Sequence, residues 1–169
     1  MGLRTWLRNQ PGILEWMYQT TYVGFRRLHP IIARIGYDRF SRWLLPIERA
    51  SKKALFGCQM CGQCILHQTG MVCPMTCPKN LRNGACGGVR INSNCEVIAD
   101  MKCVWVTAYN RAQEMQVFGE EMIVVKQPAN HRLEDTSAWI NMLRGNDQIG
   151  PKGWADLPHN PVIEKQFMK

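Results

Sequence analysis

The chain has 169 residues, of which 46% are hydrophobic, and it carries a formal net charge of +8 at pH 7. This length suits one domain, or one domain with an arm, and the ordinary apolar content argues against disorder throughout the chain. No apolar stretch approaches the roughly 20 residues of a membrane span or resembles the apolar region of a secretory signal, so we expect a cytoplasmic protein.

Most of the positive charge lies in residues 1–57, which hold ten Lys or Arg and three acidic residues. Apolar residues at helical spacing begin near Ile13, and we expect Pro30 to end this helix and Pro46 to end a second one. Such basic, aromatic-rich helices can dock on a partner, pack on their own domain or lie peripherally on an anionic membrane. For this basic amphipathic helical arm we favour docking on a partner, and place membrane contact last.

All eight cysteines lie in residues 58–103, a segment rich in Gly, Pro and Asn that has no helical or strand period. In a reducing compartment, clustered cysteines are more often metal ligands than disulfides. Disulfides confined to the middle of the chain would also leave both flanks unconstrained. We therefore predict a metal-binding core, whose candidate ligands are Cys58, Cys61, Cys64, Cys73, Cys77, Cys86, Cys95 and Cys103.

The spacing of Cys58, Cys61 and Cys64 favours iron–sulfur ligation over zinc. Zinc ribbons use two separated CxxC pairs, whereas in bacterial ferredoxins three cysteines at this spacing are joined by a Cys-Pro further along the chain. Two Cys-Pro steps follow here, at Cys73 and Cys77, although eight residues separate Cys64 from Cys73 where a ferredoxin has three. We predict two [4Fe–4S] clusters, with structural zinc as the alternative.

The spacing leaves open which four cysteines share a cluster, because any of the five later cysteines could complete the CxxCxxC set. We assign Cys77 to the first cluster, which leaves Cys73, Cys86, Cys95 and Cys103 for the second.

Four polar residues near the cysteines are given secondary roles. His67 lies among apolar residues and is expected to be a hydrogen-bonded neighbour and not a ligand. Lys79, Arg82 and Arg90 are expected to offset cluster charge or to be solvated. No phosphate loop, dinucleotide fingerprint or nucleophile–base arrangement is present, so we expect no independent catalytic site.

Residues 104–169 return to ordinary patterning. We predict a helix from Cys103 to Gly119 and a short strand or extended segment over residues 122–125. A further helix is predicted over residues 137–144.

That last helix should be capped by Asp135 or Thr136 and stopped by Gly145. The glycines and prolines from residue 150 onward predict an extended C-terminal tail. The expected fold is a small α-rich or irregular metal-bound domain, in which cysteine-rich loops surround metal clusters and helices flank them, with a helical N-terminal arm.

The phrases "FGCQMCGQC", "TGMVCPMTCPKNLRNGACGG" and "MKCVWV" closely resemble the methylene-tetrahydrofolate reductase C-terminal domain family, and "HRLEDTSAWINMLRG" is similar to its downstream segment. The resemblance covers about residues 54–145 and leaves the arm unmatched. It implies a non-catalytic, cysteine-rich accessory subunit of a methylenetetrahydrofolate reductase complex in one-carbon metabolism. The implied partner is the catalytic subunit, a (β/α)8 barrel that binds FMN or FAD, with an electron-donor subunit as a further partner.

Three functions compete at this point. Iron–sulfur clusters would relay electrons to or from the partner's flavin, whereas zinc sites would only shape and stabilise the reductase, because zinc has no redox chemistry. Nucleic-acid binding is disfavoured, because the positive charge lies in the arm and no zinc-finger spacing with paired histidines is present. We favour electron transfer and expect no nucleic-acid partner.

Overall fold

A computed structural model describes residue 6 and residues 9–150 of the chain. This part consists of α-helices, short 3₁₀ helices and irregular loops; its only bridge of strand type is an isolated one between Asn94 and Lys102. The predicted α-rich, irregular architecture is confirmed for these residues. The predicted C-terminal tail falls almost entirely outside them. None of the described helices is long and apolar enough to cross a membrane.

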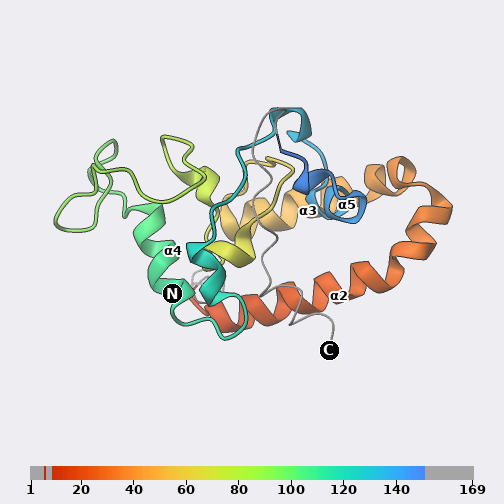
Figure 1. Ribbon diagram of the computed structural model, residues 1–169, viewed down its shortest axis with the longest axis horizontal. Coiled ribbons are helices and arrows are strands. Elements are labelled where there is room, and N and C mark those ends of the chain that lie inside the picture. Colours follow the sequence, from red (N-terminus) through yellow and green to blue (C-terminus); the bar gives the residue numbers. More distant parts are fainter. Residues whose placement is uncertain (1–5, 7–8, 151–169) are drawn as a thin grey trace.

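The N-terminal arm is made of two helices, α2 (Pro11–Ile35) and α3 (Tyr37–Phe56), which meet at Gly36. Figure 1 shows α3 running back from this corner, so that both helices border the rest of the molecule. Gly36 has a φ of 93°, a backbone conformation that residues with a Cβ rarely adopt. The change of direction therefore depends on a glycine.

The predicted stops at Pro30 and Pro46 are wrong, because both prolines lie inside helices. A proline removes one backbone donor and strains the preceding turn, but tertiary packing can outweigh that cost. Beyond Pro30, Ile32 is only 2% exposed, and beyond Pro46 the residues Glu48 and Lys52 are buried. Buried residues beyond each proline thus support the continuation of the helix.

The first half of α2 packs on the body of the molecule. Leu14 belongs to the apolar core, together with Leu66, Met71, Cys73, Met115 and Phe118. Further along α2, the ring of Tyr18 stacks on His67 with a centroid separation of 4.8 Å, and Phe25 stacks on Trp139 at 5.1 Å. One face of the arm is therefore part of the same packed unit as the cysteine loops.

The helix after the last cysteine is shorter than predicted. Helix α4 (Val104–Ala112) begins directly after Cys103, and the chain then turns into a 3₁₀ helix, Gly119–Ile123. The backbone becomes extended only at Val124, so residues 122–123 are helical and not strand. No local sequence signal marks this early stop.

Helix α5 (Ala138–Arg144) matches the helix predicted over residues 137–144. Its cap is Ser137, whose Oγ accepts the backbone N–H of Ile140 at 3.3 Å, and not Asp135 or Thr136. The predicted stop at Gly145 is confirmed, since this glycine has a φ of 72° at the C-cap.

Candidate metal centre

The eight cysteines separate into two groups of four, each lining its own small cavity. We call these the first and second cysteine sets. The first set consists of Cys58, Cys61, Cys64 and Cys73. The second set consists of Cys77, Cys86, Cys95 and Cys103. All eight are free thiols. The centre of a water molecule can occupy about 20 Å³ of the first cavity and about 10 Å³ of the second.

Around the first cavity the CxxCxxC cysteines lie with Cys73, whereas Cys77 lines the second cavity and also a more open hollow that Cys61 lines. The assignment made from spacing has Cys73 and Cys77 the other way round, and which cysteines share a cluster stays a prediction. A single 3₁₀ turn, Pro74–Thr76, lies between them. The backbone N–H of Thr76 bonds to the carbonyl of Cys73 at 3.1 Å. Across this turn the chain passes from one cavity to the other, a change of position that cysteine spacing does not reveal.

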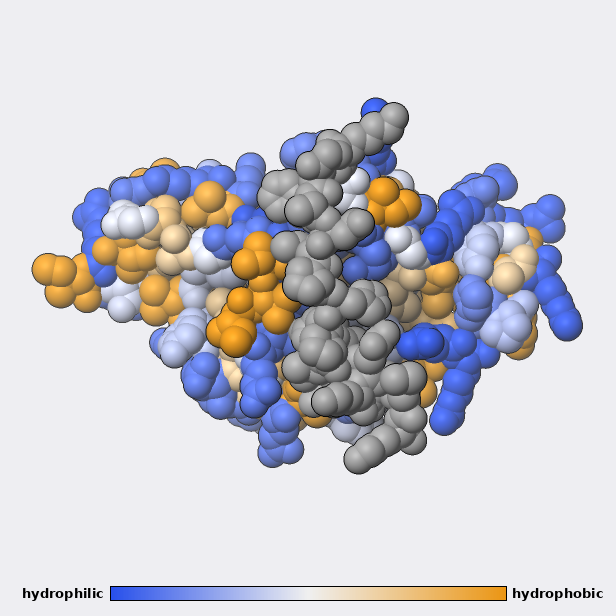
Figure 2. Space-filling model, in the orientation of Figure 1, coloured by the Kyte–Doolittle hydropathy of each residue, from blue (hydrophilic) through white to orange (hydrophobic). Residues whose placement is uncertain are grey.

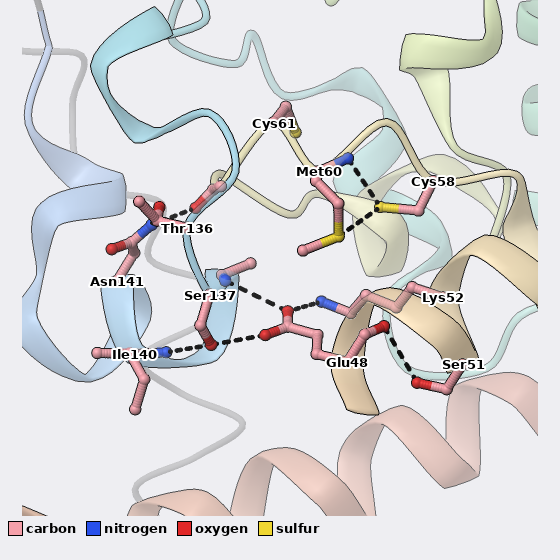
Figure 3. Close-up of polar contacts among 12 residues, drawn as sticks. Glu48, Ser51, Lys52, Cys58, Met60, Cys61, Thr136, Ser137, Ile140 and Asn141 are labelled. Atoms are coloured by element: carbon pink, nitrogen blue, oxygen red, sulfur yellow. Dashed lines mark hydrogen bonds and ion pairs between the residues drawn. The ribbon is translucent and has the colours of Figure 1, made fainter. Parts of the chain in front are cut away.

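The CxxCxxC loop bends around the first cavity through two left-handed residues. Met60 has a φ of 52° and Gly62 a φ of 72°. The backbone N–H of Met60 donates to the sulfur of Cys58 at 3.3 Å, as Figure 3 shows. A Cβ at Gly62 would overlap the carbonyl oxygen of Leu133. A glycine is therefore needed where the loop meets the C-terminal part of the chain.

Residues from far along the chain fasten this loop in place. The backbone N–H of Asp135 bonds to the carbonyl of Met60 at 2.9 Å, and the Asn141 amide donates to the carbonyl of Gly62 at 2.9 Å. The buried side chain of Gln63 accepts the backbone N–H of Asn130 at 2.6 Å. The first cavity is consequently closed by α5 and by the segment that precedes it.

Two thiols of the first set, Cys58 and Cys73, are hydrogen-bonded to each other. The pKa of Cys58 is lowered to about 6, first because the thiol of Cys73 donates a hydrogen bond to its sulfur and further because of the N–H of Met60 and the charge of Lys52. The same hydrogen bond, with burial, raises the pKa of Cys73. Burial also raises the pKa of Cys64. A metal binding here would displace the remaining protons.

Backbone N–H groups that point at sulfur recur in both sets. Besides Met60 at Cys58, the N–H of Leu66 bonds to Cys64 and that of Met75 to Cys73. In the second set, N–H groups two and three residues beyond Cys95 bond to its sulfur and lower its pKa. Such bonds stabilise thiolates, and in metal sites they orient the ligands and tune the metal.

A buried ion pair borders the first cavity. The Lys52 ammonium lies 2.5 Å from the Glu48 carboxylate, which also accepts the Ser137 hydroxyl at 2.6 Å and the Ala138 backbone N–H at 3.2 Å (Figure 3). Burial alone would lower the pKa of Lys52, but the nearby Cys64 and Glu48 raise it. The α3 helix thereby connects the first cysteine set to the cap of α5.

A second cation, Arg82, is 8% exposed and lines the same cavity. Its Nη2 donates to the carbonyl of Gln63 at 3.0 Å and its Nε to that of Gln127 at 2.8 Å. Nη1 has no hydrogen-bond partner among the described residues. Of the two roles expected for this arginine from sequence, solvation is therefore wrong.

The second cavity is bordered by charges of a different kind. Lys79 and Glu96 form an ion pair there, with side chains 39% and 36% exposed. The thiol of Cys86 approaches the Glu96 carboxylate at 3.6 Å. Arg90, the third cation named from sequence, is exposed and donates to the backbone carbonyl of Glu96 at 3.3 Å. The second set thus lies beside a mutually neutralised pair that is itself partly exposed.

His67 lines neither cavity, in keeping with its expected role as a neighbour. Its ring stacks on Tyr18, and its Nε2 lies 3.5 Å from the Glu121 carboxylate. Sequence reasoning did not single out Glu48, Lys52 or Gln63, which contact or line the first cavity. The only available signal was the i, i+4 spacing of Glu48 and Lys52, which is common on exposed helices.

The geometry bears on what could occupy the cavities. Among the described residues, no group of three or more His, Cys, Asp or Glu side chains converges as a single ion requires. Thiolates around one zinc ion lie about 2.3 Å from it and hence about 4 Å apart, whereas each thiolate of a [4Fe–4S] cluster binds a different iron. With room for only about one or two water molecules, neither cavity selects between zinc and an iron–sulfur cluster. Metal binding itself stays a prediction.

Comparison with known proteins identifies the family of this chain. No curated protein and no solved structure matched the chain. The family model described as methylene-tetrahydrofolate reductase C terminal matches residues 37–132, which is more than half of the chain. This match includes the whole of α3, of which the resemblance seen in the sequence reached only the last residues, and it ends before α5. The chain therefore belongs to the methylene-tetrahydrofolate reductase C-terminal family.

Proposed function

We propose that this chain is an iron–sulfur accessory subunit of a methylenetetrahydrofolate reductase complex. Its two cysteine sets would hold two [4Fe–4S] clusters and relay electrons to or from the flavin of the catalytic subunit. The observation that carries this proposal is the separation of eight cysteines into two sets of four around two cavities. The family membership supports the connection with the reductase.

When bound, each cluster would accept and release single electrons. The protein's own contribution is to hold thiolates and to exclude water. In the first set, the backbone N–H of Met60 donates to Cys58, and the side chains of Met60, Leu66 and Met75 line the cavity. Apolar lining and hydrogen bonds to sulfur are two of the factors through which a protein sets a cluster's potential.

Reduction of the folate would take place on the partner. The first and second cavities have room for the centres of water molecules over about 20 and 10 Å³, whereas pockets for drug-sized ligands measure roughly 300–1,000 Å³. Neither could enclose a folate or a flavin. The FMN or FAD therefore belongs, in this proposal, to the catalytic subunit.

The arm would contribute to docking on that subunit. One face of α2 is packed on this chain, but Trp16 is 65% exposed and Trp43, on α3, is 79% exposed. Exposed tryptophans are enriched among the residues that dominate protein–protein interfaces. Cytoplasmic location and a further electron-donor subunit remain part of the same proposal.

The test is to purify the chain with its natural partners in the absence of oxygen and to measure iron, sulfide and zinc per chain. Eight irons and eight sulfides, with a visible band that bleaches on reduction, are expected from two clusters. Zinc without iron would overturn the electron-transfer role and support structural zinc sites instead.

Two cysteine variants separate the sites and the roles. Cys61→Ala and Cys86→Ala should each lose about half of the iron, because they belong to different sets. Each should also prevent reduction of the complex's flavin by the physiological donor, while an artificial donor still reduces the flavin directly. Full flavin reduction by the physiological donor in both variants would contradict the relay.

A further inference from the structure

Arg82 is a buried cation without a counter-ion in the described part of the chain. Its side chain lines the first cavity and lies within 4 Å of no carboxylate there; its two hydrogen bonds go to the neutral carbonyls of Gln63 and Gln127. The remaining nitrogen, Nη1, is buried and has no acceptor. Burying an uncompensated charge is strongly unfavourable, and an unmade buried hydrogen bond adds to that cost.

The nearby acids do not supply the missing charge. The carboxylate of Glu48 is already bonded to Lys52, Ser137 and Ala138. Asp147 interacts electrostatically with Arg82, but no ion pair within 4 Å joins the two among the described residues. The remaining anions that the first cavity can offer are the thiolates of its four cysteines and whatever those thiolates hold.

We propose that Arg82 is the fixed counter-ion of the anionic group held by the first cysteine set, and that it makes this group the more easily reduced of the two. This inference rests on the function proposed above. Arg82 acts as a positioning residue: it places a permanent positive charge and a free N–H beside the group without taking part in electron transfer.

The electrostatic reason is the gain of one negative charge on reduction. A nearby cation stabilises the reduced form, and the effect is strongest where solvent is excluded. At the first cavity, Lys52 is balanced by Glu48, so Arg82 supplies the net positive charge. At the second cavity, Lys79 is paired with Glu96 and both are partly exposed. The second site therefore lacks an equivalent buried cation.

This difference between the two sites determines where an electron is held. An electron shared between the sites would reside mainly at the first set, within the packed body. The loops of the second set project from one end of the molecule in Figure 1, where Figure 2 shows apolar side chains at the surface. Ile91 is fully exposed there, and Val97 and Ile98 are also exposed.

The experiment is a redox titration of the complete, anaerobically purified complex, followed by electron paramagnetic resonance and visible absorption. In Arg82→Gln, one cluster should become harder to reduce by at least tenfold at a fixed potential, which is 59 mV for one electron. The other cluster should be unchanged. Arg82→Lys, which keeps the charge, should restore most of the difference. Introducing Arg82→Gln into the Cys86→Ala protein, which retains the first set, should shift the potential of the remaining cluster by the same amount.

The matched control is Arg132→Gln, which removes one positive charge from an exposed position. It should leave both potentials unchanged. An Arg82→Gln protein with full iron content and unaltered potentials would overturn the inference, as would an equal shift in Arg132→Gln. If Arg82→Gln fails to load the first cluster, Arg82→Lys decides: normal loading supports the charge, and loss of loading refutes it. Iron absent from the wild-type complex would instead refute the proposed function itself.

Discussion

The carboxylate of Glu15, on α2, accepts the backbone N–H of Phe118 at 2.8 Å. It also accepts the N–H groups of Gln116 and Val117, at 2.9 and 2.8 Å, so that one buried side chain caps the turn after α4. Glu15→Ala would leave three backbone donors without this acceptor. We expect the free energy of unfolding to fall by about 2–4 kcal/mol, measured by urea unfolding under anaerobic conditions.

The control for that variant is Glu114→Ala, which removes an exposed carboxylate from the same region. It should change the stability by less than about 0.5 kcal/mol. Equal losses in the two variants would show that Glu15 contributes only its charge and that the arm is not anchored by this cap.

Gly62 offers a test of how the CxxCxxC loop is fastened. Gly62→Ala introduces a methyl group that overlaps the carbonyl of Leu133, at a residue whose φ is 72°. Gly84→Ala, where φ is 78° and no atom lies within 4 Å of the new methyl, separates the backbone cost of about 1–2 kcal/mol from the collision. We expect Gly62→Ala to be the more destabilising by thermal unfolding. A loss no larger than that of Gly84→Ala would contradict the close contact.

Ser137 joins the ion pair of α3 to the start of α5. Ser137→Ala removes both the donor to Glu48 and the helix cap, and we expect a loss of about 2–3 kcal/mol in urea unfolding. Ser51→Ala is the matched control, because its hydroxyl only bonds to carbonyls of its own helix. That substitution should be almost neutral. A neutral Ser137→Ala would show that the network in Figure 3 does not stabilise α5.

Glu121 gives a pH-dependent prediction. Burial raises its pKa from 4.5 to about 7, so the folded protein holds a proton that the unfolded chain releases between these values. Its contribution to stability is present below about pH 4.5 and is lost as the pH rises to 7. Glu121→Gln should therefore become more stable, relative to wild type, between pH 5 and pH 8.

Two buried neighbours of Glu121 also change their protonation near this pH range. Burial lowers the pKa of His67 to about 3 and that of Lys126 to about 8, and both groups are present in the wild type and in the variant. Subtracting the wild-type stability at each pH removes the cysteines and the part of these titrations that does not depend on Glu121. Because the charge of Glu121 raises the pKa of Lys126, the difference is best read between pH 5 and pH 7. The exposed Glu120→Gln should show a flat difference. A flat or falling difference for Glu121→Gln would refute a carboxyl that is protonated in the fold.

The helices show how far local sequence rules reach. The glycine stop at Gly145 follows from chain chemistry alone, because a left-handed C-cap requires almost no tertiary support. The prolines of α2 and α3 misled the prediction, because burial beyond Pro30 and Pro46 outweighs their local cost. The early end of α4 depends on contacts across more than 100 residues, such as the one between Glu15 and Phe118, which periodicity cannot reveal.

In the candidate site, too, some features can be predicted from the sequence and others cannot. The sequence identifies the eight thiols, because cysteine clustering is a local signal, but not the partition in which Cys73 joins the first set. That partition depends on how one short turn is oriented in the fold. The sequence names Arg82 without deciding its role, and its burial beside the first cavity follows only from packing against Gln63 and Gln127.

The contacts that close the first cavity also bear on the order in which the sites mature. Its walls include Thr136 and Ala138, and Asn141 holds the loop at Gly62. The second cavity is lined by residues 77–105 alone. Because a chain leaves the ribosome from its N-terminus, the second site can close while α5 is still being synthesised. We expect iron delivery to reach the second site first, and a ribosome stalled before α5 emerges to carry only that one.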